Sequence, residues 1–304
     1  MLKGRFRLQT ARPWSLARAY SAQSVFRPVP SLGDGTLTTF RHEAFNPALP
    51  RLLPRKHFLD TVPAVSRWFT PIPSTSSAHV QEDRSHLNTA YLSPHADALV
   101  PLEISSAIQF SRAEHPLSFF LSACAAPPVP GTSIYLAQAS IPDLPPVLQA
   151  DVPTPELVRR AGRGDVYGSS VWLGRAPTYT PLHRDPNPNL FVQLAGRKSM
   201  RLFVPEAGGK VFAKVKGVVG GGGNATMRGE EMMVGEERSV LEEVVWGESA
   251  EWEVEVEGWE CEVDAGDGLF IPKGWWHSIR GIGEGMTGSV RVHHIFTTVR
   301  PRSD

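Results

Sequence analysis

From Thr132 onward the sequence consists of short apolar runs separated by turn residues. The clearest runs are SIYLAQASI (133–141), VYGSSVWLG (166–174), LFVQLAG (190–196), KSMRLFVP (198–205) and SVRVHHIFTTV (289–299). They have the length of strands and are rich in β-branched and aromatic residues. Short strands at near-even spacing are typical of a β-sandwich or barrel, and the 27 prolines and 27 glycines favour turns over long helices. We therefore predict a mainly β fold, with a hairpin at 190–205 that turns at Gly196-Arg197.

The segment before these runs mixes helix and strand patterns. VPAVSRWF (62–69) and HPLSFFLSACAA (115–126) place apolar residues at helical spacing, whereas ALVPLEIS (98–105) is a strand candidate. We interpret residues 21–130 as an N-terminal α/β elaboration that packs on a β core formed by residues 131–304.

An insert at 206–262 interrupts the regular strands. Gly217–Gly223 is nearly all glycine and is expected to be flexible. Residues 229–262 contain 13 glutamates and one basic residue, Arg238. Within them EWEVEVEGWECEV (251–263) alternates apolar and charged residues, which predicts a strand with one charged face. That face is interpreted as solvated surface, or alternatively as an acidic lip that recruits a basic peptide.

The first 33 residues carry six basic residues and no acidic residue. An arginine-rich, acid-free segment that mixes hydroxyl and apolar residues is typical of a mitochondrial transit peptide. Arg18-Ala19-Tyr20-Ser21 also resembles a cleavage site of the matrix processing peptidase. We therefore predict that residues 1–20 are removed and that the protein acts in the mitochondrial matrix. A basic tail on a cytoplasmic or nuclear protein is the alternative.

Composition argues against several other classes of protein. No apolar run approaches the roughly 18–20 residues of a membrane span. The net charge of zero gives no sign of a nucleic-acid-binding surface. Two cysteines are too few for a disulfide framework or a cysteine-based zinc site.

The segment TYTPLHRDPNPNLFVQLAGRKSMRLF (178–203) carries a His-X-Asp pair at the end of an apolar run. Alternate residues of a strand share a face, so His183 and Asp185 can both point into a barrel. His277 starts another predicted strand and supplies a third ligand when the barrel brings distant strands together. Two imidazoles and one carboxylate form the facial triad of non-haem Fe(II) sites, which leaves positions for a bidentate co-substrate and O₂. Taken alone, His277 after two tryptophans would also suit a packed core histidine.

Lys198 indicates an anionic ligand. A lysine inside an apolar barrel is costly unless an anion pairs with it, and a dicarboxylic acid would supply that anion. Met200 and Leu202 share its strand face and favour an inward direction, whereas a lysine at a hairpin edge would face water. Thr180 can add a hydroxyl hydrogen bond to the same ligand.

Together these motifs resemble the JmjC-domain Fe(II)/2-oxoglutarate oxygenases of the cupin superfamily, in particular the small hydroxylase branch with a bare JmjC domain. The matching pieces are YLAQ (135–138), VWLG (171–174), TPLHRDPNPNLFVQLAGRKSMRLF (180–203) and GDGLFIPKGWWH (266–277). The resemblance implies a double-stranded β-helix, or jelly-roll, core. It also implies roles for eight residues: His183, Asp185 and His277 as iron ligands, Lys198 and Thr180 at the distal carboxylate of 2-oxoglutarate, Tyr135 and Asn189 as further co-substrate contacts, and Trp172 in the substrate pocket.

The resemblance further implies a dioxygenase that uses Fe(II), 2-oxoglutarate and O₂ to hydroxylate a protein or RNA-associated substrate. A cupin-type metalloprotein with other chemistry and a catalytically silent JmjC binding module are the alternatives, and demethylation also occurs in the family. The last strand departs from the family pattern. It has Arg291, Val292, His293 and His294 where many members have Asn or Ser near the metal, and we do not count these histidines as ligands.

Overall fold

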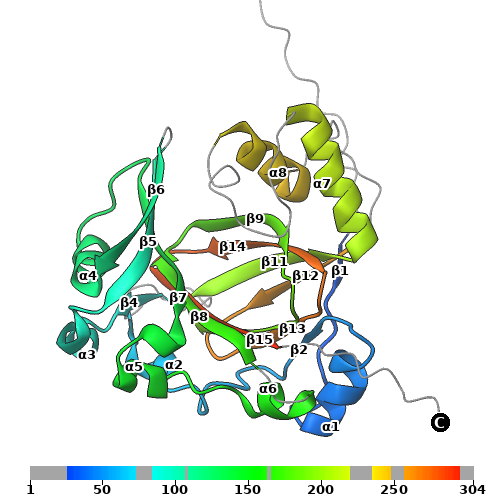
Figure 1. Ribbon diagram of the computed structural model, residues 1–304, viewed down its shortest axis with the longest axis horizontal. Helices are drawn as coiled ribbons and strands as arrows, with labels where there is room; N and C mark the ends of the chain where they lie inside the picture. The colour runs from blue at the N-terminus through cyan, green and yellow to red at the C-terminus, as the bar shows by residue number, and fades with distance from the viewer. Residues whose placement is uncertain are drawn as a thin grey trace, which may run out of the picture.

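Two β-sheets face each other in the computed structural model, which describes residues 26–72, 84–106, 109–162, 166–219, 235–247 and 257–294 (Figure 1). The five-stranded sheet has the order β1 (Phe26–Pro28), β12 (Gly258–Val263), β11 (Arg197–Phe203), β14 (Trp276–Ile282), β9 (Thr178–Arg184). The eight-stranded sheet has the order β2 (Arg51–Leu52), β13 (Gly268–Ile271), β10 (Asn189–Ala195), β15 (Met286–His294), β8 (Val166–Arg175), β7 (Ser133–Ser140), β5 (Leu99–Ser105), β6 (Phe110–Pro116). A small third sheet pairs β3 (Phe69–Pro71) with β4 (Ser85–Leu87).

Successive strands from β9 to β15 pass repeatedly from one sheet to the other. β9, β11, β12 and β14 lie in the smaller sheet, while β10, β13 and β15 lie in the larger one. This is the connectivity of a jelly-roll barrel, in which both inner faces line one interior. The predicted mainly β, jelly-roll fold is confirmed.

The predicted hairpin at 190–205 is wrong. β10 pairs with β13 and β15, whereas β11 pairs with β12 and β14, so the two consecutive strands lie in opposite sheets. Gly196 makes the crossing in the left-handed region, with φ +63°, and a Cβ there would lie 2.6 Å from the carbonyl oxygen of Met286. The turn at Gly196 was therefore placed correctly, but it joins two sheets instead of folding one strand back on the other.

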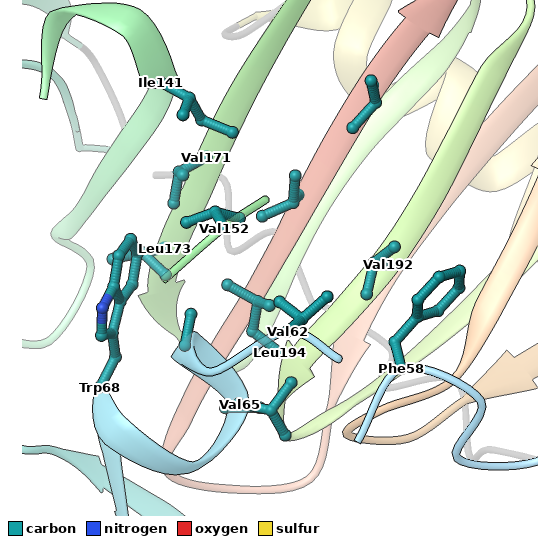
Figure 2. Packing of buried hydrophobic residues seen from close by; sticks show 14 of the residues in the cluster. Phe58, Val62, Val65, Trp68, Ile141, Val152, Val171, Leu173, Val192 and Leu194 are labelled. Atoms are coloured by element: carbon teal, nitrogen blue, oxygen red, sulfur yellow. The ribbon is translucent and has the colours of Figure 1, made fainter. Parts of the chain in front are cut away.

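Short helices cover the outer face of the larger sheet. They are α1 (Leu37–Phe40), α2 (Ala64–Arg67), α3 (Thr89–Leu92), α4 (Leu117–Ala125), α5 (Pro146–Ala150) and α6 (Glu156–Ala161). Figure 2 shows Val65 and Trp68 of the α2 region directed towards alternate residues of the sheet, such as Leu173 on β8 and Leu194 on β10. Each fully buried side chain of this size contributes about 1.5–3 kcal/mol. The helices predicted at 62–69 and 115–126 and the strand at 98–105 are confirmed as α2, α4 and β5.

The insert contains two helices that were not predicted from the sequence. α7 (Pro205–Val219) and α8 (Glu236–Trp246) lie over the outer face of β9 and β14 (Figure 1). Buried Leu241 and Val245 anchor α8, and Glu242 pairs with Arg280 of β14 at 2.9 Å. Part of the acidic charge is therefore neutralised within the fold.

Several sequence predictions fall partly or wholly outside the described residues. They are the transit peptide at 1–20, residues 220–223 of the glycine run, the acidic residues at 230–231, 248, 251, 253 and 255, the first half of the strand at 251–263, and residues 295–299 of the last strand. Residues 217–219 of the glycine run belong to α7, and the described part of the 251–263 segment forms β12. Among the described residues, no helix has the length and apolar character needed to cross a membrane.

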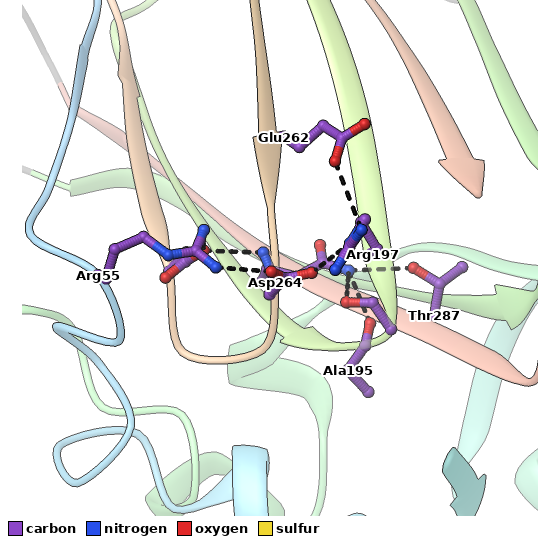
Figure 3. A network of polar contacts seen from close by, with 9 residues as sticks. Arg55, Ala195, Arg197, Glu262, Asp264 and Thr287 are labelled. Carbon is purple, nitrogen blue, oxygen red and sulfur yellow. Dashed lines mark hydrogen bonds and ion pairs between the residues drawn. The ribbon is translucent and has the colours of Figure 1, made fainter. Parts of the chain in front are cut away.

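A polar network ties the N-terminal segment to both sheets near the Gly196 crossing (Figure 3). Asp264, at the end of β12, accepts from Arg55 at 2.6 Å and from Arg197 of β11 at 2.7 Å. Arg55 also pairs with Asp267 before β13. On the other side of the crossing, Gln193 donates to Thr287 of β15 at 3.1 Å. These contacts tie together the ends of five barrel strands, β10, β11, β12, β13 and β15.

A second buried acid organises the helical cover. The carboxylate of Asp151 is fully buried and accepts from Trp68 Nε1 at 2.8 Å, Tyr91 Oη at 2.6 Å and Arg67 at 2.7 Å. Asp151 thereby joins the segment after α5 to α2 and α3.

Replacing this acid should destabilise the protein. We expect Asp151→Ala to lower the free energy of unfolding by on the order of 2–3 kcal/mol, because the buried indole and phenol donors of Trp68 and Tyr91 lose their acceptor. Urea denaturation measures the change, and exposed Asp143→Ala serves as the control. Equal stability of the two variants would contradict this assignment.

Candidate metal centre

The two candidate histidines are neighbours across a strand pair. β14 pairs with β9 so that His277 lies opposite His183, and the ring centroids are 4.2 Å apart. Both side chains are buried. A bulge in this pair, between the His277 and Ile279 positions, allows Thr180 and His183 both to face inward despite their odd spacing.

Each histidine is oriented by the backbone carbonyl two residues before it. Nδ1 of His183 lies 2.8 Å from the carbonyl oxygen of Pro181, and Nδ1 of His277 lies 3.2 Å from that of Trp275. A carbonyl oxygen can only accept, so both Nδ1 atoms carry the proton and both Nε2 atoms present a lone pair. Nε2 of His277 is buried and has no hydrogen-bond partner among the described residues. Such a nitrogen suits a metal ligand, whose other ring nitrogen is normally held by a carbonyl or carboxylate.

Asp185 completes the cluster from a turn. β9 ends at Arg184, because Pro186 has no N–H to extend the ladder, so the prediction that Asp185 lies within the strand is wrong. Its carboxylate nevertheless faces the histidines, with Oδ1 3.9 Å from His183 Nε2 and Oδ2 3.6 Å from His277 Nε2. Asn189 donates to Oδ2 at 3.0 Å and fixes the carboxylate plane.

The three ligand atoms lie within 4.8 Å of one another, close enough for one ion to bind all three. Burial lowers the pKa of His183 and of His277 below the ordinary value, so both rings are neutral near pH 7. Burial alone would raise the pKa of Asp185, but His277 and Arg291 outweigh it and lower that pKa well below the usual range. Two neutral imidazoles and one ionised carboxylate are the protonation states that a divalent metal requires. The residues therefore fit the iron site that the resemblance implies.

Lys198 lies inside the barrel, and the interpretation as a water-facing lysine is wrong. Its side chain is 3% exposed and shares the inner face of β11 with Met200 and Leu202. Nζ donates to Ser289 Oγ at 2.8 Å and lies 3.5 Å from Tyr135 Oη. The structure thus brings Lys198 and Tyr135 together.

Two hydroxyl residues near Lys198 were not predicted. Ser289 of β15 contacts its ammonium group directly, and Thr178 lies in the same cross-strand row, since Lys198 pairs with Gly281 and Gly281 pairs with Thr178. The two-residue alternation along β15 and β9 could have indicated both residues.

The remaining predicted residues lie around the same interior. Thr180 is buried. It is the next inward-facing residue of β9 after Thr178 and lies closer to His183. The Trp172 ring is 6.1 Å from Tyr135, and the guanidinium of Arg291 lies 4.7 Å from its centroid. The structure therefore places all eight predicted site residues around one interior.

An open groove of 870 Å³ lies on the surface beside the Tyr135 side of this interior. It runs between the region of α4 and the start of α8, and Phe119 and Arg238 are among its lining residues. A smaller cavity of 90 Å³, lined by Tyr135 and Thr178, shares Arg238 and Pro177 with the groove.

Comparison with known families agrees with this geometry. The sequence profile of the cupin-like domain matches residues 39–295. The chain belongs to this family.

Curated relatives of this cupin-like protein include lysine-specific demethylases and a Jumonji C domain-containing protein, which confirms the resemblance. The lysine-specific demethylase JMJ30 of Arabidopsis thaliana is 28% identical over 148 residues, 49% of this chain and 31% of that protein. Lysine-specific demethylase 8 of Danio rerio is 28% identical over 150 residues, 49% of this chain and 33% of that protein. Jumonji C domain-containing protein 5 of Drosophila melanogaster is 25% identical over 264 residues, 83% of this chain and 56% of that protein. The cupin-like chain thus spans between about a third and just over half of the length of these relatives.

The cluster should bind one divalent metal ion per chain. We expect Asp185→Ala to weaken Mn(II) binding by at least about a hundredfold, since even residues that only orient a ligand contribute ten- to hundredfold. Isothermal titration calorimetry measures the affinity.

His293→Ala is the matched control for this experiment. It removes an imidazole near Asp185 that lies outside the three-residue cluster and should leave one-to-one binding intact. Loss of binding in the control but not in Asp185→Ala would contradict the assignment of ligands.

Proposed function

We propose that this chain is an Fe(II)- and 2-oxoglutarate-dependent dioxygenase that hydroxylates a protein or RNA-associated substrate in the mitochondrion. The observation that carries the proposal is the cluster of His183, Asp185 and His277, with both Nε2 atoms and the carboxylate converging on one point. The buried lysine in the same barrel interior supports it, because it supplies a positive charge for the distal carboxylate of the co-substrate.

Bound Fe(II), 2-oxoglutarate and O₂ would together supply the oxidising power that converts a C–H bond into C–OH. The side chains of this protein would position the metal and the co-substrate. The carbonyls of Pro181 and Trp275 hold both imidazoles in one tautomer and one orientation, and Asn189 holds the carboxylate. Lys198, with Ser289 beside it, is placed to bind the distal carboxylate of the co-substrate.

Apolar side chains close the interior behind this site. Phe191, Met200 and Ile279 belong to one buried cluster inside the barrel and keep water from that side. The groove lined by Phe119 and Arg238 adjoins the small cavity of Tyr135 and Thr178, and because it is open to the surface it can admit a segment of polypeptide. We therefore favour a protein substrate.

Lysine demethylation is the second candidate, because two of the relatives described above are named lysine-specific demethylases. Both reactions begin with oxidation of a C–H bond and differ in whether the hydroxylated carbon stays attached. Mass spectrometry of proteins incubated with the enzyme separates them, since hydroxylation adds one oxygen and demethylation removes a methyl group.

Loss of Lys198 should weaken co-substrate binding without affecting metal binding. We expect Lys198→Ala to weaken the binding of 2-oxoglutarate by at least about tenfold, the usual effect of a buried charge-assisted hydrogen bond. Mn(II) affinity should stay at the wild-type value. Calorimetry with each ligand, together with succinate production in the presence of Fe(II), measures the two effects.

Exposed Lys210→Ala, on α7, is the control for removal of a lysine. If Lys198→Ala bound 2-oxoglutarate as tightly as this control, a cupin-type metalloprotein with a different co-substrate would be favoured. A wild-type protein that bound neither ligand would favour a catalytically silent binding module.

The basic, acid-free start of the chain supports the mitochondrial part of the proposal. A fusion of residues 1–33 to a fluorescent protein should therefore reach mitochondria and be shortened there. Replacement of Arg5, Arg7, Arg12 and Arg18 by Gln should prevent import. A diffuse cytoplasmic or nuclear signal for the unaltered fusion would contradict the proposed location.

A further inference from the structure

Strand β15 presents a polar row to the barrel interior, and Arg291 lies at its centre. Val290 and Val292 point to the opposite side and join the core beneath α2. Ser289, two residues before Arg291, contacts Lys198, so the inner face of one strand serves both the lysine and the metal cluster.

The guanidinium of Arg291 lies directly against the metal cluster. Nη1 is 3.4 Å from Nε2 of His183, and the group lies over the Trp172 ring at 4.7 Å. The side chain is 4% exposed. Because Nδ1 of His183 is held by the Pro181 carbonyl, Nε2 is the acceptor and Arg291 is the donor in this contact.

This contact and a metal ion compete for the same lone pair. Nε2 of a neutral imidazole has one lone pair, which can accept an N–H from Arg291 or bind a metal, but not both. A divalent cation at this position would also be repelled by a guanidinium only a few ångströms away in a buried site. Metal binding at His183 therefore requires Arg291 to turn to another acceptor.

A carboxylate at the metal is the acceptor that a guanidinium suits best. Its planar fork of N–H donors matches the two oxygens of a carboxylate. The Arg291 guanidinium and the Lys198 ammonium group also both lie near the Phe191 ring, 6.0 and 5.5 Å from its centroid. The interior thus has a cation for each end of a dicarboxylic acid.

We propose that Arg291 couples metal binding to carboxylate binding: it competes with the metal for His183 Nε2 and releases that nitrogen when the 2-oxo acid end of the co-substrate accepts its N–H groups. The inference rests on the proposed use of 2-oxoglutarate. It gives the departure in the last strand a function, namely that metal is retained mainly when co-substrate is present.

The test measures Mn(II) affinity of the full chain by calorimetry, with and without N-oxalylglycine, an analogue of 2-oxoglutarate that is not oxidised. In the wild type, N-oxalylglycine should tighten Mn(II) binding. In Arg291→Gln, Mn(II) alone should bind more tightly than in the wild type, by a factor on the order of ten. The coupling, which is the factor by which N-oxalylglycine tightens Mn(II) binding, should fall by the same factor. Arg291→Lys keeps the positive charge but not the planar guanidinium, so its Mn(II) affinity and its coupling should lie between those of the wild type and Arg291→Gln. This variant provides the measurement if Arg291→Gln does not fold.

Arg280→Gln is the matched control, since Arg280 lies on β14, the strand that precedes β15 in the chain, and donates to Glu242 of α8 on the outside of the barrel. Its Mn(II) affinity and coupling should equal those of the wild type. Unchanged Mn(II) affinity and coupling in Arg291→Gln would overturn the inference while leaving the proposed function intact. A wild-type protein that binds neither Mn(II) nor N-oxalylglycine would instead reject the proposed function itself.

Discussion

The barrel depends on the crossing at Gly196. Only a residue without a side chain fits there, because a Cβ would meet the backbone of Met286, and the left-handed φ disfavours other residues. The crossing sends β10 and β11 into opposite sheets, so that Asn189 and Lys198 approach one interior from two sides. The contacts of Asp264 with Arg55 and Arg197 hold this end of the barrel in place.

Once the barrel has formed, few further contacts are needed to orient the side chains of the candidate metal cluster. Both histidines bond the carbonyl two residues before them, so the adjacent backbone orients each ligand without help from elsewhere. The inner face of β15 then adds Ser289 at the lysine and Arg291 at His183. Local geometry fixes the ligands, and a single long strand links the two halves of the pocket.

The sequence predicted the local features well and the long-range features poorly. His183, Lys198 and His277 could be selected because strand periodicity and residue chemistry are local properties. The partner strands of β10 and β11 could not be predicted, because a glycine turn has the same sequence pattern whether the chain folds back in one sheet or crosses to the other. The glycines of α7 concealed its apolar positions Val211, Phe212 and Val215, and Pro186 was an overlooked signal that β9 ends before Asp185.

The short strands β1 and β2 occupy the outermost positions on one side of the two sheets. β1 pairs with β12 and β2 with β13, so residues 26–28 and 51–52 cover backbone that would otherwise be open to another chain. A fragment that starts at the first long barrel strand would keep His183, Asp185 and His277 yet expose two unpaired edges. We therefore expect solubility to be lost before metal affinity as the chain is shortened from its N-terminal side.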